Sequence, residues 1–291
     1  MQKKVYAQLY SLVRTNREGH LEALEALSQI GYDGVELMGR NTGGLTEAEF
    51  AARLRDWKLE VISSHALRDE TDFRFAAALG ARYTDIRPDY ANSSRDEVLR
   101  CCERLNEAGR VRAAYGLKAV IHNHAEEFWW VDDREGGVRI YDLLLENTDP
   151  ALVGFEFDVG WGARAGVRPE EYITRYAGRF PLLHVKECNE AAKDRAGLEH
   201  FPKKVLELGP PKIINGTPYF SEEQKRMLDA SRSWNVELGH GLLDWKAIVA
   251  AAEAQGCDGY INEREYYHLA SVPDSDPVAC ARQDYAFLRS L

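Results

Sequence analysis

Short apolar runs alternate with amphipathic stretches along almost the whole chain. The apolar runs are rich in valine, isoleucine, leucine and aromatic residues, which is typical of β-strands buried on both faces. Eight such runs lie at residues 4–9, 34–37, 60–64, 83–87, 118–122, 152–158, 181–185 and 259–263. We predict a strand at each of them.

The stretches between these runs carry apolar residues at helical spacing. Leu21, Leu24 and Leu27 recur every three residues, and Thr46 followed by Glu49 is the helix-start signature known as a capping box. We predict helices over residues 20–30, 46–57, 95–115, 141–147, 169–176, 244–255 and 278–288. Helices that connect consecutive strands in this way are typical of a parallel sheet.

Eight strands alternating with helices in 291 residues predict a (β/α)8 TIM barrel, forming a single domain over residues 1–291. The rival fold, an open doubly wound sheet, most often has a glycine-rich phosphate loop after its first strand. The segment QLYSLVRTNREGH, which follows the first run, contains no such loop. A long insertion over 189–240 follows the seventh strand. It is either a lid over the catalytic face, or an oligomer contact or surface excursion.

Composition and charge narrow the class of protein. The 37 basic and 47 acidic residues give a net charge of −10, which disfavours nucleic acid and anionic membranes as partners. No apolar run is long enough to cross a bilayer, and the first residues do not resemble a signal peptide. Five cysteines without a CxxC pair indicate reduced thiols and a cytoplasmic location.

Four of the predicted strands end in side chains that can bind a metal ion. In chain order these are His122, His124, Glu127, Asp158, His184 and Glu263. A barrel gathers the carboxyl ends of its strands on one face, so these side chains are expected to form one divalent-metal site. Carboxylates and imidazole without thiolates suit Mn²⁺, Mg²⁺, Co²⁺ or Zn²⁺.

Some of these residues also have a purely structural explanation. Asp158 could cap a helix, but Gly160 and Trp161 do not indicate that a helix begins there. Glu263 could instead form a surface salt bridge with Arg264.

Two further charged residues share strand faces with the predicted ligands. Glu156 is expected one layer deeper in the barrel than Asp158, where a buried charge needs a partner such as Arg87 or Lys186. Lys186 itself is either a solvated lysine or a cation beside the oxygens of a substrate.

Such a site supports proton transfer next to a carbonyl group. A divalent ion that binds a hydroxyl and the adjacent carbonyl acidifies the C–H bond between them and stabilises the resulting enediolate. A carboxylate on each side can then remove and return the proton. Isomerisation, epimerisation and elimination all use this apparatus, so the ligands alone do not choose among them.

Four motifs carry a family resemblance over nearly the whole chain. They are HNHxxEF at 122–128, GFExDVGW at 154–161, LLHVK at 182–186 and ELGxGxxDW at 237–245. The chain resembles the sugar phosphate isomerase/epimerase family, also called the xylose isomerase-like TIM barrels, and is most similar to the subgroup with HNHxxEF on strand five. The resemblance implies a metal-dependent isomerase or epimerase acting on a keto or aldo sugar. The alternative is a lyase or dehydratase that uses the same site, similar to inosose dehydratase or to enzymes that eliminate from 3-keto-glycosides.

The resemblance also implies a set of metal ligands. Relatives bind one divalent ion, for which Mn²⁺ is our first choice, through Glu, Asp, His and Glu on strands five to eight. Asp158, His184 and Glu263 match the last three of these ligands. Many relatives have Glu where this chain has His122, so the first ligand is either His122 or Glu127, and we favour Glu127. The first and last acids of the set commonly transfer the proton.

The remaining roles implied by the resemblance concern catalysis and the substrate. The residues expected to act in catalysis are Glu127, Glu263, His122 and Lys186. The residues expected to contact the substrate are His124, Trp161, His65, Glu36 and Arg87. Trp161 stands where many relatives have the histidine of a DxxH pair, which suggests an indole stacked on the sugar ring.

Two other classes of protein fit less well. A DNA-repair endonuclease of the same superfamily would need more histidine and acidic ligands than this chain offers, and a basic face. A non-catalytic carbohydrate-binding barrel would not need an intact ligand set. The expected partner is a small carbohydrate, and association into a homo-oligomer through the helical faces or the insertion is consistent with the family.

Overall fold

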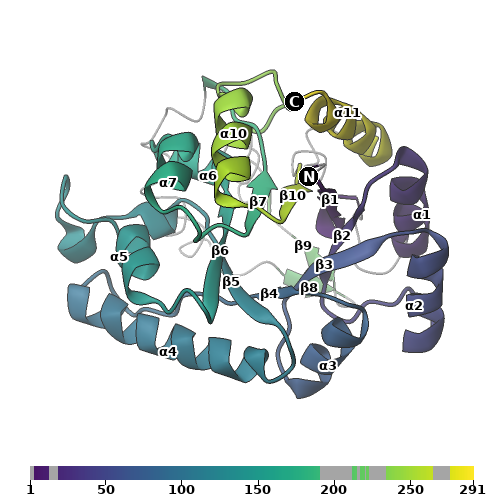
Figure 1. The fold of residues 1–291 in the computed structure, drawn as a ribbon, viewed down its shortest axis with the longest axis horizontal. Coiled ribbons are helices and arrows are strands. Elements are labelled where there is room, and N and C mark those ends of the chain that lie inside the picture. The colour runs from purple at the N-terminus through teal and green to yellow at the C-terminus, as the bar shows by residue number, and fades with distance from the viewer. Residues whose placement is uncertain are drawn as a thin grey trace.

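Eight parallel strands close into a barrel in the computed structural model (Figure 1), which describes residues 3–12, 19–190, 212–214, 217–219, 221–222, 234–264 and 276–291. Their order around the barrel is β1-β10-β7-β6-β5-β4-β3-β2. They are β1 (Val5–Gln8), β2 (Gly34–Met38), β3 (Glu60–His65), β4 (Tyr83–Asp85), β5 (Lys118–His122), β6 (Val153–Asp158), β7 (Leu182–Val185) and β10 (Gly259–Asn262). Each strand coincides with a predicted run, which confirms the (β/α)8 barrel.

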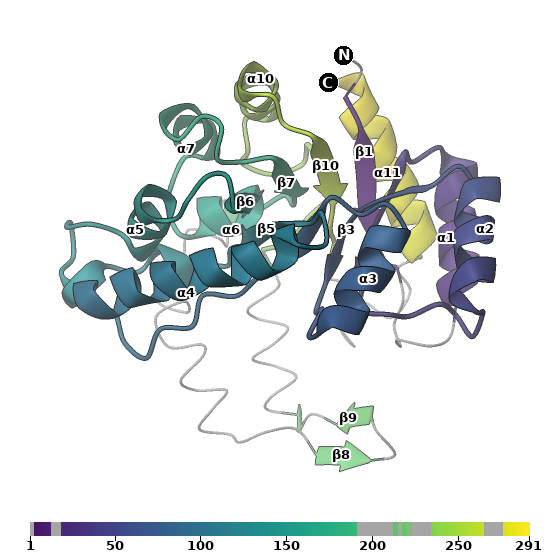
Figure 2. The ribbon, with the colours of Figure 1, turned by 60° about the horizontal axis from the view of Figure 1, so that its bottom comes forward.

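Helices surround the strands on the outside (Figures 1 and 2). The α-helices are α1 (His20–Ile30), α2 (Glu47–Asp56), α3 (Glu70–Ala78), α4 (Arg95–Ala113), α5 (Ile140–Asn147), α6 (Val159–Arg164), α7 (Pro169–Arg175), α10 (Trp245–Gln255) and α11 (Pro277–Ser290). The described residues also form three short 3₁₀ helices, η1 (Leu9–Ser11), η2 (Glu126–Phe128) and η3 (Val131–Asp133). The capping box predicted at Thr46 is confirmed, because its side chain accepts from the backbone N–H of Glu49 while the Glu49 carboxylate accepts from that of Thr46.

Two helices were not predicted from the sequence. Helix α3 begins after Asp69, whose carboxylate accepts hydrogen bonds from the backbone N–H groups of Thr71 and Asp72. Helix α6 begins directly after Asp158, whose carboxylate accepts from the backbone N–H of Trp161 at 2.8 Å. The expectation that no helix starts at Asp158 is therefore wrong, and this residue both caps a helix and faces the barrel interior.

An apolar layer fills the barrel interior below the carboxyl ends of the strands. Its members come from six strands and are Tyr6, Ile62, Tyr83, Val120, Leu182 and Ile261. Residues two apart on a strand share a face. Val120 therefore lies beneath His122, and Leu182 lies beneath His184. This buried apolar layer lies directly beneath the polar side chains at the carboxyl ends of the strands.

Most of the insertion predicted over 189–240 lies outside the described residues. Within it, β8 (Lys212–Ile214) and β9 (Thr217–Tyr219) pair as a two-stranded antiparallel sheet (Figure 2). A lid role for this insertion stays a prediction. Among the described residues, no helix is long and apolar enough to span a membrane.

Candidate metal centre

Four side chains from neighbouring strands converge at the carboxyl end of the barrel. They are His122, Asp158, His184 and Glu263, and their nearest ligand atoms all lie within 4.8 Å of one another. His122 Nε2 lies 3.5 Å from Asp158 Oδ2, and His184 Nδ1 lies 3.1 Å from Glu263 Oε2. The strand register explains the convergence, because Asp158 is the direct neighbour of His184 across β6 and β7.

Asn123 lies between the two histidines of the HNH motif. Its side chain holds the backbone of Asp158 in position relative to β5. Its side-chain oxygen accepts from the backbone N–H of Asp158 at 3.0 Å, and its side-chain nitrogen donates to the backbone carbonyl of Asp158 at 3.2 Å. The amide thus continues the pairing of β5 with β6 beyond the last strand residues. The motif therefore has a structural part as well as a chemical one.

The polar atoms of this group fit a metal ion. His122 Nε2 and Asp158 Oδ2 are buried and make no well-aligned hydrogen bond among the described residues, although they lie 3.5 Å apart and the Lys186 ammonium lies 3.3 Å from Asp158 Oδ2. Such atoms are costly unless a ligand satisfies them. Burial and the neighbouring His184 lower the pKa of His122. A neutral imidazole is the form that binds a metal. Two imidazoles and two carboxylates in this arrangement suit a borderline divalent cation.

Lys186 bridges the two carboxylates of the group. Its ammonium lies 3.3 Å from Asp158 Oδ2 and 2.9 Å from Glu263 Oε2, and the side chain is 1% exposed. Burial raises the pKa of Asp158 although Lys186 opposes this, whereas Lys186 and His184 outweigh burial and hold the pKa of Glu263 well below its usual range. The lysine therefore balances the charge of two buried acids.

A second group of buried charges lies against the inner side of His184. Glu36, His65 and Glu156 join His184 there, with ligand atoms within 4.8 Å of one another. His65 Nε2 lies 2.6 Å from Glu156 and 3.0 Å from Glu36. His184 Nε2 lies 2.9 Å from Glu36 and 3.4 Å from Glu156. Glu156 is in the deeper layer as expected, but it pairs with these two histidines and not with Arg87 or Lys186.

This arrangement lets each carboxylate face both imidazoles. Burial alone would favour neutral groups, but the carboxylates of Glu36 and Glu156 outweigh it and raise the pKa of His65. The two histidines in turn hold the pKa of Glu36 well below its usual range. The orientation of the His184 ring is thus fixed from below through Nε2, while Nδ1 faces the metal-ligand group.

Glu127 lies in a different group from Asp158, His184 and Glu263. Its ligand atoms gather with those of His124 and Glu126, and its carboxylate accepts from the backbone N–H of His124 at 2.7 Å. Strand β5 ends at His122, and the chain then turns through η2, which carries Glu127 to the side of the strand ends. Burial and the charge of Glu126 raise the pKa of Glu127 to about 8.

This raised pKa predicts a pH dependence of stability. The folded chain keeps the Glu127 proton that an unfolded chain releases near pH 4.5, so the stabilisation is full below that pH and is lost as the pH rises toward 8. In Glu127→Gln this contribution is absent. We expect its free energy of unfolding to rise relative to wild type by up to about 1.4 kcal/mol per pH unit across this window. Denaturant unfolding from pH 5 to 8 measures this, with the exposed Glu103→Gln as control. Parallel profiles for Glu127→Gln and wild type would contradict the expectation.

A cavity of about 330 Å³ opens beside the metal-ligand group. Three of the predicted substrate-binding residues, His65, His124 and Arg87, line it together with His122 and Glu127. Its wall also includes Glu126, Tyr90 and Trp129, none of which was predicted as a site residue. For Tyr90 and Trp129 the available signal was an aromatic residue in a loop that follows a strand.

Two other predicted substrate-binding residues have different surroundings. Glu36 is fully buried below His184. The Trp161 ring packs edge-on against His124, with centroids 5.3 Å apart, and its centroid is 5.5 Å from the Lys186 ammonium.

The residues of the ELGxGxxDW motif pack around the carboxylate of Glu187, which was not among the predicted site residues. Glu187, just after β7, accepts from the backbone N–H of Gly239 at 3.1 Å and from the indole N–H of Trp245 at 2.6 Å. A Cβ on Gly241 would lie 2.1 Å from the carbonyl oxygen of Cys188, so glycine is required there. The motif therefore anchors the start of α10 to the end of β7, next to Lys186.

The fold is a TIM barrel, and its site is a buried cluster of glutamate, aspartate and histidine side chains that could hold a metal ion. Residues 24–291 match the sequence family described as xylose isomerase-like TIM barrel, and the chain belongs to that family.

Two curated relatives match part of the chain. Over 181 residues the chain is 31% identical to inosose dehydratase of Halalkalibacterium halodurans, and the match covers 58% of this chain and 52% of that protein. Over 190 residues it is 28% identical to inosose dehydratase of Lactiplantibacillus plantarum, covering 56% and 61%. The matched segments thus span about half to three fifths of these relatives.

The fold is shared with a sugar phosphate isomerase/epimerase of Parabacteroides distasonis. The TM-score is 0.71 at 22% identity, with 99% of this chain and 98% of that chain covered. At this identity the likeness shows the fold alone.

Proposed function

We propose that this chain is a divalent-metal-dependent sugar isomerase or epimerase of the HNHxxEF subgroup. The observation that carries the proposal is the convergence of His122, Asp158, His184 and Glu263 within 4.8 Å at the carboxyl end of the barrel. That face is where barrel enzymes place their chemistry. A keto or aldo sugar, or a derivative of one, is the proposed substrate.

These four residues are the proposed ligands, with Mn²⁺ as first choice and Mg²⁺, Co²⁺ or Zn²⁺ as alternatives. We now favour His122 over Glu127 on strand five, because His122 joins the group and Glu127 lies in the adjacent one. When bound, the ion would supply a Lewis acid for a carbonyl and its neighbouring hydroxyl, which stabilises negative charge on an enediolate.

Two carboxyl groups of the chain are suited to opposite parts in proton transfer. The lowered pKa of Glu263 keeps its carboxylate ionised, which is the form that a base requires. The pKa of Glu127, raised to about 8, keeps it protonated near neutral pH, so it can donate one. Carboxyl groups whose surroundings separate their pKa values commonly share the acid and base roles. Lys186, between Asp158 and Glu263, would steady developing negative charge.

The 330 Å³ cavity is the proposed site for the sugar. Its wall combines ring faces with polar hydrogen-bonding groups, which suits a polyhydroxylated ligand. We infer that His124, His65, Arg87 and Trp161 contact or shape the substrate. Glu36 is already engaged by Ser63, His65 and His184, so we infer that it positions His184 and does not bind hydroxyls.

The second candidate is a lyase or dehydratase that uses the same groups. The observation that favours it is that the matched curated relatives carry the name inosose dehydratase. Removal of the same proton followed by loss of a β-substituent would use the same acid and base.

The test is metal analysis followed by solvent exchange. The purified protein is assayed for bound Mn, Co, Zn and Mg, then incubated in D₂O with ketoses, inososes and 3-keto-glycosides. One equivalent of metal with deuterium in a recovered sugar or its isomer supports the isomerase or epimerase. Deuterium entry with release of water or an aglycone supports the lyase. No bound metal, and no exchange after metal is added, would overturn both for this panel.

The group beneath His184 predicts an effect on metal affinity. Glu36 accepts from His184 Nε2, which directs Nδ1 toward the other ligands. Glu36→Gln weakens that acceptor, so we expect about 10–100-fold lower Mn²⁺ affinity by calorimetry. Melting of the metal-free protein reports any misfolding separately, and the exposed Glu253→Gln is the control. An affinity within threefold of wild type in folded Glu36→Gln would remove its positioning role.

A further inference from the structure

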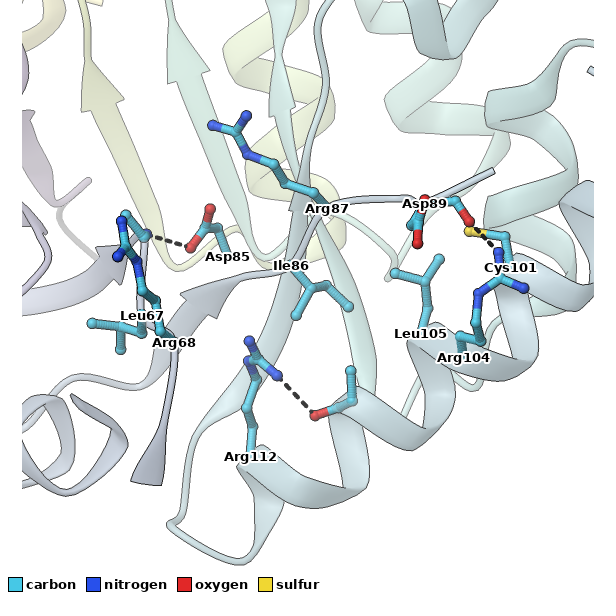
Figure 3. Close-up of a pocket in the computed structure, with 12 residues that line it drawn as sticks. Leu67, Arg68, Asp85, Ile86, Arg87, Asp89, Cys101, Arg104, Leu105 and Arg112 are labelled. Carbon is cyan, nitrogen blue, oxygen red and sulfur yellow. Dashed lines mark hydrogen bonds between the residues drawn. The ribbon is translucent and has the colours of Figure 1, made fainter. Parts of the chain in front are cut away.

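A second cavity, of about 380 Å³, lies outside the metal centre (Figure 3). It is bounded by the loop that follows β3, by the segment that follows β4 and by helix α4. Its charged lining residues are Arg68, Arg87, Arg104, Arg112, Asp85 and Asp89. Arginines thus outnumber acids in this cavity, although the chain as a whole has a net charge of −10.

The carboxylates in the cavity compensate the charge of its arginines only in part. Asp85 is buried, and its carboxylate already accepts from the backbone N–H of Ala66 at 2.8 Å. Arg104 pairs with Glu97 at 3.0 Å. By contrast, no ion pair within 4.0 Å is formed by the guanidinium of Arg68 or of Arg112 with the described carboxylates, although the backbone N–H of Arg68 donates to Asp72.

Arg112 is a partly buried arginine whose guanidinium has few hydrogen-bond acceptors around it. It lies over the Phe73 ring at 4.7 Å, and Nη1 donates to the carbonyl of Ala108 at 3.2 Å. Its Nε is buried without a hydrogen-bond partner among the described residues. Burial lowers the pKa of Arg112, and the carboxylate of Asp85 offsets this effect only in part. An anion in the cavity would supply the missing acceptor.

The rest of the lining suits an organic ligand. Ile86, Leu105 and Ala108 give an apolar wall beside the arginines. Asp85, Ile86 and Arg87 line both this cavity and the one beside the metal centre, so the two are adjacent. In Figure 3, Arg87 points away from Arg112 and α4, while Arg68 and Arg112 remain lining residues without a carboxylate paired to their guanidinium groups.

We propose that this cavity binds the phosphate or carboxylate group of a small organic anion, with Arg112 as the main contact and Arg68 as the second. The anion is either the charged end of a substrate that reaches from the neighbouring cavity or a separate effector. The shared chemistry is a planar guanidinium facing oxygens of an anion.

Calorimetry on the EDTA-treated protein tests this without metal or turnover. The probes are inorganic phosphate, fructose 6-phosphate and citrate. We expect saturable binding to wild type and at least tenfold weaker binding to Arg112→Gln. Arg110→Gln is the matched control, because Arg110 lies on the same helix, pairs with Glu107 and does not line the cavity. Because Arg112 packs on Phe73, the exposed Arg68→Gln provides a second variant that should weaken binding without disturbing the fold.

Competition separates the two sources of the anion. If the anion is part of a substrate, fructose 6-phosphate binds more tightly than inorganic phosphate and loses that advantage when a neutral sugar fills the neighbouring cavity. If it is an effector, the neutral sugar has no effect. No saturable binding to wild type, or equal binding to wild type, Arg112→Gln and Arg68→Gln, would overturn the proposal. Neither of these two results bears on the proposed proton-transfer function, because that function is tested separately by solvent-deuterium exchange into the sugar.

Discussion

Replacing Glu263 by glutamine is expected to lower the rate of solvent-deuterium exchange by about 10²–10⁴-fold, the usual contribution of a general base. Glutamine keeps the size of the side chain and an oxygen that can accept from Lys186, but it cannot take up a proton. The pKa of Glu263 is held low by Lys186 and His184, so the wild-type carboxylate is ionised, which is the form that a general base requires. The measurement is deuterium incorporation into a sugar that wild type exchanges.

The control separates lost chemistry from lost metal. Glu253→Gln makes the same change on the exposed side of α10 and should exchange at the wild-type rate. Metal content of Glu263→Gln is measured in parallel, and saturating Mn²⁺ is added to compensate for weaker binding. If the metal-loaded variant still exchanges within threefold of wild type, Glu263 is a ligand at most and the base must be sought elsewhere.

The barrel could be predicted from the sequence because its strands are buried on both faces. Runs such as 118–122 are therefore apolar and buried at their central positions and stand out from the helices between them. Helix α3 was missed because ETDFRFAAA is only 9 residues long, and its two large apolar residues, Phe73 and Phe75, are two positions apart, which is the spacing of a strand. Its signal was the cap, since Asp69 precedes two acids in the first turn.

Only the part of the candidate site that stands at the carboxyl ends of strands could be predicted from the sequence. Asp158, His184 and Glu263 come from consecutive barrel strands, so their meeting follows from topology. The choice between His122 and Glu127 depends on where β5 ends and how the chain turns, which an apolar pattern does not reveal.

The contacts among Glu36, His65, Glu156 and His184 could not be predicted from the sequence, for a different reason. Glu36 and His65 come from β2 and β3, across the barrel interior from Glu156 and His184 on β6 and β7. Their pairing depends on side-chain length and burial inside a closed barrel. No local pattern in the sequence records such a contact.

Replacing Lys186 by methionine is expected to destabilise the metal-free protein by about 3–5 kcal/mol, the cost of removing one partner from a buried ion pair. The ammonium is 1% exposed and lies within 3.3 Å of both Asp158 and Glu263. Without it, two buried carboxylates face each other with less positive charge nearby. A divalent cation competes with the ammonium for the same oxygens, so Lys186→Met should also bind Mn²⁺ more tightly than wild type.

The two effects have opposite signs, which makes the prediction specific. Ligand binding to the folded state adds to its stability, so the deficit of Lys186→Met seen in EDTA should shrink when Mn²⁺ is present. Denaturant unfolding under both conditions measures this. Lys118→Met is the control, because Lys118 donates to the carbonyl of Pro150, lies at the opposite end of β5 from His122, and should respond to Mn²⁺ as wild type does. An equal deficit with and without Mn²⁺ would mean that Lys186 stabilises the barrel by packing alone, and that the cation does not occupy the space between Asp158 and Glu263.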